Sequence, residues 1–160
     1  MNIAIISDLH DNEPYLAAFL KSSTADVLLM CGDIANLETL TTISKEFKGQ
    51  IYFVFGNADS FYPEEIPDNI INLGEAAIIE LDNRKIGLCH EPFKIPKLLE
   101  EKPYIIFHGH THIPWIEQKG ETMIVNPGTL GGWRNPSTFA VWDTSRGAPE
   151  LVRTDEIKNK

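Results

Sequence analysis

The chain opens with Asn2-Ile-Ala-Ile-Ile-Ser-Asp-Leu-His10, an apolar, β-branched run that ends in polar side chains. The run has the composition of a short buried strand, and the residues from about Pro14 to Lys21 have the apolar spacing of a helix. The pattern continues with a strand over Val27–Cys31, a helix over Leu37–Phe47 and a strand over Ile51–Phe55. Strands that alternate with helices predict an α/β fold with a parallel sheet.

The second half of the sequence predicts antiparallel hairpins instead. Turn residues separate three pairs of short apolar runs. The expected pairs are Ala77–Leu81 with Lys85–Cys89, Trp115–Gln118 with Thr122–Val125, and Phe139–Asp143 with Glu150–Arg153. A helix over about Ile95–Glu101 and a strand over Tyr104–Phe107 are expected between the first two pairs.

Length and charge narrow the class of protein. The 160 residues, 42% of them apolar, suffice for one core and are too few for two, so residues 1–160 are expected to form a single domain. The net charge of −9 argues against a stable nucleic-acid complex or a membrane partner. The N-terminus lacks a signal-peptide pattern, which favours a cytoplasmic location. Cys31 and Cys89 form no CxxC pair and are expected to be buried strand residues.

All five histidines lie in short polar segments at the ends of apolar strands. The polar segments are Ser7–His10, Gly32-Asp33, Gly56–Asp59, Cys89-His90 and His108–His112. In open α/β sheets, ligands bind at the carboxyl ends of the strands. We therefore expect these side chains to converge.

Each of these segments taken alone has an ordinary structural explanation. Asp8 and His10 project to one side and can chelate an ion if the chain stays extended, but the same residues also cap turns. Asp33 fits either a metal ligand or a turn aspartate, and Asn57 follows a glycine as in many turns. A lone histidine such as His90 is more often structural than a ligand.

Gly109-His110-Thr111-His112 is the most specific segment. Two imidazoles two residues apart, just past a strand, are poorly explained by packing and suit a site with two metals. All the segments together are stronger evidence for a metal site than any one segment alone. Mixed imidazole and carboxylate ligands favour manganese, iron, nickel or zinc, and a site without cysteine does not suit a structural zinc cluster.

This series of residues resembles the calcineurin-like metallophosphoesterase superfamily from Ile3 to about Trp142, and the short length is similar to its small bacterial and archaeal phosphodiesterases. The resemblance implies a four-layer α-β-β-α sandwich with two mixed β-sheets that hold two divalent metal ions, manganese first and nickel, iron or zinc as alternatives. The implied ligands are Asp8, His10 and His112 for the first metal, Asn57, His90 and His110 for the second, and Asp33 as the bridge.

The implied activity is that of a metal-dependent phosphoesterase, and more narrowly a phosphodiesterase, that hydrolyses a small phosphate ester by a hydroxide bridging the two ions. Asp33, Asn57 and His110 are the expected catalytic residues, and Asp59 is expected to orient an imidazole. One alternative is a non-catalytic scaffold like the retromer subunit of the same fold. A DNA nuclease is the other, and the acidic chain argues against it.

Other positions extend or break the family pattern. Asn126-Pro127-Gly128-Thr129 is similar to the family's Asn-Pro-Gly-Ser segment, and Arg134 lies where the family often keeps an arginine. Ala58 stands where His or Cys is usual, which removes a proton donor, and Glu91 stands where glycine is common. His108 lies outside the implied ligand set.

An oligomer is also expected from the sequence. Trp133 and Trp142 lie near the C-terminal hairpin. If both are exposed, a symmetric dimer or higher homo-oligomer would cover them.

Overall fold

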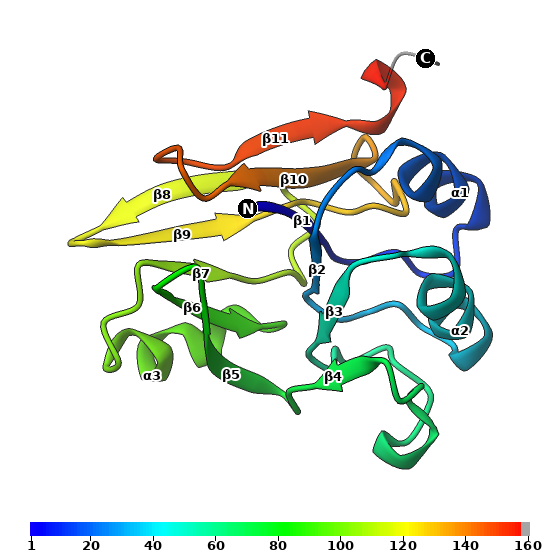
Figure 1. The fold of residues 1–160 in the computed structure, drawn as a ribbon, viewed down its shortest axis with the longest axis horizontal. Coiled ribbons are helices and arrows are strands. Elements are labelled where there is room, and N and C mark those ends of the chain that lie inside the picture. The colour runs from blue at the N-terminus through cyan, green and yellow to red at the C-terminus, as the bar shows by residue number, and fades with distance from the viewer. Residues whose placement is uncertain (158–160) are drawn as a thin grey trace.

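The structure, a computed structural model, describes residues 1–157, and two β-sheets form its centre (Figure 1). The first sheet has the strand order β11-β10-β1-β2-β3-β4, and the second has the order β5-β6-β7-β9-β8. The strands are β1 (Asn2–Ile6), β2 (Val27–Met30), β3 (Gln50–Phe53), β4 (Ile70–Asn72), β5 (Ala76–Leu81), β6 (Arg84–Cys89), β7 (Ile105–Phe107), β8 (Trp115–Lys119), β9 (Thr122–Asn126), β10 (Thr138–Asp143) and β11 (Glu150–Arg153). The helices are α1 (Glu13–Ser22), α2 (Leu37–Glu46) and α3 (Ile95–Leu99), with short 3-10 turns at Pro63–Glu65, Pro92–Lys94 and Thr154–Glu156.

The side chains of β1 show how the layers are built. Ala4 and Ile6 belong to the apolar cluster that α1 and α2 cover, whereas Ile3 and Ile5 belong to the cluster between the two sheets. A third cluster joins α3 to the outer face of the second sheet. Figure 1 shows the resulting order, with α1 and α2 on one side, α3 on the other and both sheets between them. The predicted four-layer α-β-β-α sandwich is confirmed.

Both sheets mix parallel and antiparallel pairs. Strands β1 to β4 pair in parallel, and the β10–β11 hairpin joins β1 in the antiparallel sense. In the second sheet, β6, β7 and β9 are parallel, while β5 and β8 pair antiparallel at its two edges. The three predicted hairpins are confirmed. Strand β4, with three residues, was not predicted.

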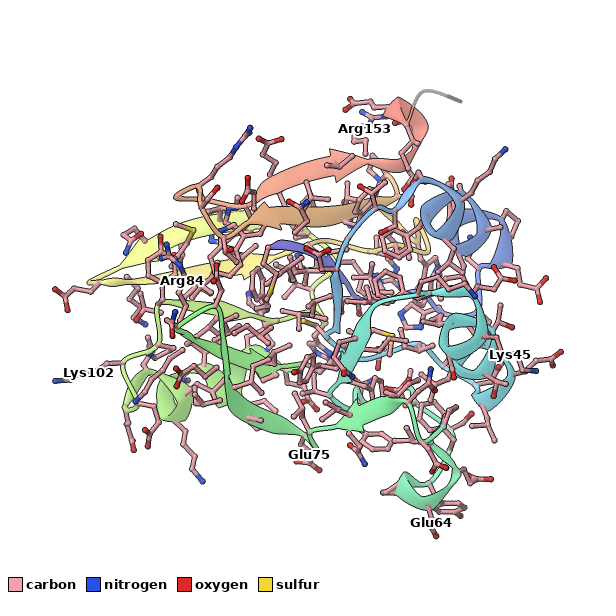
Figure 2. All side chains as sticks on the ribbon, viewed as in Figure 1. Lys45, Glu64, Glu75, Arg84, Lys102 and Arg153 are labelled. Carbon is pink, nitrogen blue, oxygen red and sulfur yellow. The ribbon has the colours of Figure 1, made fainter. Side chains whose placement is uncertain are left out.

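Charged side chains project from the periphery of this sandwich. Figure 2 shows Lys45, Glu64, Glu75, Lys102 and Arg153 pointing away from its body, and all five are exposed. None of the helices within residues 1–157 has the length and apolar character of a membrane-spanning segment.

Both cysteines are fully buried, as expected, and burial raises the pKa of the Cys89 thiol to about 12.

The expected exposure of Trp142 is wrong. Its side chain is 1% exposed and stacks on Tyr104 with ring centroids 5.9 Å apart. The reason is register, because Trp142 lies directly opposite Ile3, whose side chain faces the space between the sheets. Paired residues on antiparallel strands point to the same face. Trp133, in contrast, is 56% exposed.

Candidate metal centre

The seven predicted ligands lie at the carboxyl ends of five strands. Polar segments follow β1, β2 and β3, which are parallel neighbours in the first sheet, and β6 and β7, which are parallel neighbours in the second. The two sheets therefore contribute to one site from opposite sides. The structure brings all seven predicted residues together in two groups joined by Asp33.

The first ligand group consists of Asp8, His10 and His112. The Nε2 atom of His112 lies 3.1 Å from Asp8 Oδ1, and His10 Nε2 lies 3.9 Å from the same oxygen. The two Nε2 atoms are 3.3 Å apart. Three potential donor atoms thus surround one point.

The second ligand group consists of Asn57, His90 and His110. The Nδ1 atom of His110 lies 2.9 Å from Asn57 Oδ1 and 3.3 Å from His90 Nε2. His90 is fully buried, whereas Asn57 and His110 are exposed. This group therefore has one anchored side and one side open to solvent.

Asp33 lies between the two groups. Its Oδ2 atom is 3.3 Å from His90 Nε2 and 3.8 Å from His10 Nε2. Its Oδ1 atom accepts a hydrogen bond from the backbone N–H of Ala58 at 2.8 Å. One carboxylate oxygen is held by the backbone, and the other faces both ligand groups.

The donor set fits divalent cations. The Nδ1 atom of His90 donates to the carbonyl of Cys31 at 2.7 Å, and that of His112 donates to the carbonyl of Trp133 at 3.4 Å. In both residues the lone pair of Nε2 then points into the site, which is how metal-binding histidines are usually fixed. Asp8 Oδ1 is buried and has no hydrogen-bond partner within residues 1–157, a costly arrangement that a cation would offset.

The carboxylates of the site differ in their electrostatics. Burial raises the pKa of Asp8 above its ordinary value, although His90 and His112 oppose the shift. Burial also raises the pKa of Asp33, but the contact with His90 and the hydrogen bond from the Ala58 N–H outweigh it, so the pKa of Asp33 lies below its ordinary value. Burial lowers the pKa of His90, but its contacts with Asp33 and Asp8 outweigh burial, so the pKa of His90 lies above its ordinary value. Negative charge is thereby favoured on the oxygen that faces both ligand groups.

Five of the seven ligands adopt a left-handed backbone conformation. The φ angles are 54° for Asp8, 48° for His10, 55° for Asp33, 72° for His110 and 61° for His112. The expectation that Asp8 and His10 meet through an extended chain is therefore wrong, because a tight turn brings them together. A non-glycine residue in this region costs of order 1–3 kcal/mol and persists only where the surroundings enforce it.

Hydrogen bonds from other segments enforce this backbone. The hydroxyl of Thr129 donates to the carbonyl of Asp8 at 2.7 Å, and the Asn126 amide donates to the carbonyl of Gly109 at 3.0 Å. The family-like segment Asn126–Thr129 thus supports the ligand loops that follow β1 and β7. It contributes no member to either ligand group.

Asp59 has a different role from the one predicted. Its carboxylate accepts hydrogen bonds from the backbone N–H groups of Asp33, Ala35 and Gly56 at 3.0, 3.0 and 2.7 Å. The expectation that it orients an imidazole is wrong. Asp59 instead ties the loop after β2 to the loop after β3, and so fixes Asp33 relative to Asn57.

Two glycines were missed as parts of the site. A Cβ atom on Gly56 would overlap the carboxylate of Asp33, and one on Gly109 would overlap the hydroxyl of Ser7 and crowd Asp8. The signal in the sequence was a glycine directly beside an expected ligand. Its meaning, close approach of backbone to a ligand carboxylate, appears only in three dimensions.

The remaining singled-out positions lie around the site. His108 is 7% exposed, belongs to neither ligand group, and has a pKa lowered by burial. Glu91 lies 3.0 Å from Lys94 Nζ, so the extra negative charge beside His90 is offset. Arg134 lies with its guanidinium 4.9 Å from the centre of the Trp133 ring. Trp133 itself was not predicted to contact the site.

The fold and this donor set define a candidate centre for divalent cations, held between two sheets. Comparison with known proteins gives the family. The family model of the calcineurin-like phosphoesterase superfamily domain matches residues 1–147, and the chain belongs to this superfamily. The predicted family and the predicted phosphoesterase function are confirmed, and divalent metal ions are the cofactors that the family implies.

Individual relatives agree with this assignment. The chain is 30% identical over 142 residues to a "probable metallophosphoesterase" of Methanocaldococcus jannaschii, covering 81% of this chain and 68% of that protein. It is 25% identical over 169 residues to the phosphodiesterase YfcE of Escherichia coli, covering 89% and 88%.

Solved structures share the fold. A novel archaeal phosphodiesterase superposes with a TM-score of 0.84 at 22% identity, covering 96% of this chain and 99% of that one. Vacuolar protein sorting 29 of Cryptosporidium parvum superposes with a TM-score of 0.70 at 20% identity, covering 94% and 95%.

Proposed function

We propose that the chain is a phosphodiesterase that works with two divalent metal ions. The observation that carries the proposal is the position of Asp33 Oδ2, which faces His90 at 3.3 Å and His10 at 3.8 Å. A carboxylate oxygen placed between two donor groups is suited to a shared ligand. A pair of divalent ions bound at these residues would supply an activated water molecule and neutralise charge on the phosphate oxygens.

The residues of the chain divide the work as follows. Asp8, His10 and His112 would hold the first ion, and Asn57, His90 and His110 would hold the second, with Asp33 shared. Asn57 and His110 are exposed, so a phosphate ester can approach the second ligand group from solvent. We assign catalytic roles to Asp33, Asn57 and His110. Asp33 faces both ligand groups, and Asn57 and His110 form the exposed side of the second group.

Several finer points belong to the same proposal. Manganese is the preferred metal, with nickel, iron or zinc as alternatives, because the donors are imidazole, carboxylate and one amide. Residues 1–160 act as one domain in the cytoplasm, on a small phosphate-ester substrate. A homo-oligomer remains a prediction, and of the two tryptophans behind it only Trp133 is exposed. A monomeric mass in solution at micromolar protein would contradict it.

The scaffold alternative has a specific observation behind it, namely the shared fold of vacuolar protein sorting 29. A binding module, however, does not require two complete donor groups around one carboxylate. Family membership and the relatives named for phosphoesterase activity favour the enzyme.

Hydrolysis of bis(p-nitrophenyl) phosphate tests the proposal. Metal-stripped protein should be inactive, and addition of Mn²⁺ should restore hydrolysis, which a chelator then abolishes. The Asp33→Asn variant should stay inactive at every metal concentration. Two tightly bound ions without hydrolysis under any of the four metals would favour the scaffold, and cleavage of single-stranded DNA would favour the nuclease.

A further inference from the structure

A large aromatic side chain stands open to solvent beside the first ligand group. Trp133 is 56% exposed, and its ring lies edge-on to the imidazole of His10 with centroids 5.6 Å apart. Its ring centroid is also 5.7 Å from that of His112. The indole therefore borders the metal centre without being covered by it.

A cavity of about 530 Å³ adjoins the indole. It is lined by Leu9, His10, Asn12, Gly131, Gly132 and Trp133. Its volume lies in the range of small-molecule sites, roughly 300–1,000 Å³. Because His10 belongs both to this lining and to the first ligand group, a molecule in the cavity can reach the metal centre.

The backbone around Trp133 is held in place. The Asn12 amide donates to the carbonyl of Gly131 at 2.7 Å, which ties this loop to the segment after β1. Gly132 has a φ of 71°, and a Cβ atom there would lie 2.9 Å from the ring of Tyr15. Arg134 also has a positive φ, 65°. The loop thus fixes an exposed indole at the edge of the cavity instead of burying it.

The same loop carries positive charge. The guanidinium of Arg134 lies 4.9 Å from the centre of the Trp133 ring, in a chain with a net charge of −9. A flat aromatic surface with an adjacent cation suits a ligand that combines an aromatic ring with a phosphate. Nucleotides have this combination.

We propose that Trp133 is the stacking surface for the base of a nucleotide-type phosphodiester whose phosphate lies at the metal centre. This inference rests on the proposed function and names its substrate class. Every nucleobase has a π-face, so the indole would favour nucleotides over alkyl esters without selecting one base. The competing role is structural, since Trp133 also packs against both imidazoles of the first ligand group.

Binding of AMP and ribose 5-phosphate separates these roles, because the two ligands share sugar and phosphate and differ in the base. Titration calorimetry on Mn²⁺-loaded protein gives their affinity ratio. In Trp133→Leu the ratio should fall by roughly 5- to 150-fold, the range measured for loss of one base–aromatic stack. Trp133→Phe should recover part of it. Trp115→Leu is the matched control, since Trp115 is 54% exposed and does not line the cavity, and its ratio should equal that of the wild type.

Two outcomes of the same measurement would overturn the inference. If AMP and ribose 5-phosphate weaken by the same factor in Trp133→Leu, the indole only supports the histidines, and the inference is overturned. An unchanged ratio with unchanged affinities overturns it as well. Hydrolysis of methyl p-nitrophenyl phosphate, which has no base, is measured on the wild type in parallel. Its absence would count against the proposed function, independently of the affinity ratio.

Discussion

The two ends of the β1 segment lie in opposite environments. Ile3 to Ile6 are at most 1% exposed, pack alternately on the two faces of the first sheet, and have ordinary strand geometry. Two and four residues further on, Asp8 and His10 have left-handed backbone conformations, and Asp8 has a buried oxygen without a partner in the described part of the chain. Burial of apolar side chains stabilises the first region. The conformation and burial of the second region cost free energy, and a bound cation would offset that cost.

The difference teaches where stability and function are located. The stability of the apolar clusters offsets the free-energy cost of a strained polar site at one end of the strands. Hydrogen bonds made by Thr129, Asn126 and Asp59, which lie in other segments, hold the backbone of that site in place. Changes in the sandwich interior should therefore alter folding, and changes at the strand ends should alter metal binding and chemistry.

The largest expected effect is a gain of chemistry at the strand ends. In Ala58→His, esters with poor leaving groups should be hydrolysed up to about 10²–10⁴-fold faster, since an imidazole supplies the proton donor that alanine lacks. Good leaving groups should gain little. The Ala58 N–H bond to Asp33 uses the backbone, so it survives the substitution. A leaving-group series at matched metal content measures the effect, and a uniform change across the series would contradict the missing donor.

The second prediction compares neighbouring histidines of one segment. His110→Ala should lower kcat/KM by about 10³-fold through loss of the second ion, and His112→Ala should do so through the first. His108→Ala should cost less than about tenfold, because His108 belongs to neither ligand group. Metal content and kcat/KM are measured on all three. The reverse order would mean that the register of this segment is misassigned.

The third prediction concerns the interior. Trp142→Ala should lower the free energy of unfolding by about 3–5 kcal/mol, because it empties a buried aromatic site between the sheets. The folded fraction should still bind two ions. Trp115→Ala, an exposed counterpart, should stay within about 0.5 kcal/mol of the wild type. Urea titrations measure both, and a Trp142→Ala protein that is stable but metal-free would break the separation of regions.

The smallest expected effect comes from Asp59, which holds the ligand loops and is not itself a ligand. Asp59→Asn should weaken metal binding by about 10–100-fold, because the amide cannot accept all three backbone hydrogen bonds that fix the loops after β2 and β3. Asp155→Asn, at an exposed carboxylate, is the control. Competition with a chelator measures the affinity. Equal affinities in the two variants would show that the loops hold their shape without Asp59.

Much of the site could be predicted from the sequence. Each expected ligand follows an apolar run, and burial makes such runs recognisable as strands, so the ends of the strands mark the site. The hairpins were equally visible, because turn residues separate short apolar pairs. The four-layer packing with two mixed sheets came from the family resemblance.

The rest depends on contacts between distant segments. The side on which Trp142 points is set by its pairing with Ile3, and a one-residue shift would reverse it. The partners of Asp59 are backbone amides, which no side-chain pattern reveals. The turn that joins Asp8 to His10 uses a conformation that local sequence disfavours, and tertiary hydrogen bonds enforce it.

The central claim is that Asp33 is shared between two metal ions. Inductively coupled plasma mass spectrometry on Mn²⁺-reconstituted, desalted protein tests it most directly, with hydrolysis of bis(p-nitrophenyl) phosphate measured on the same samples. We predict two ions per chain in the wild type and loss of both, with loss of activity, in Asp33→Asn. Loss of a single ion with activity intact would contradict it.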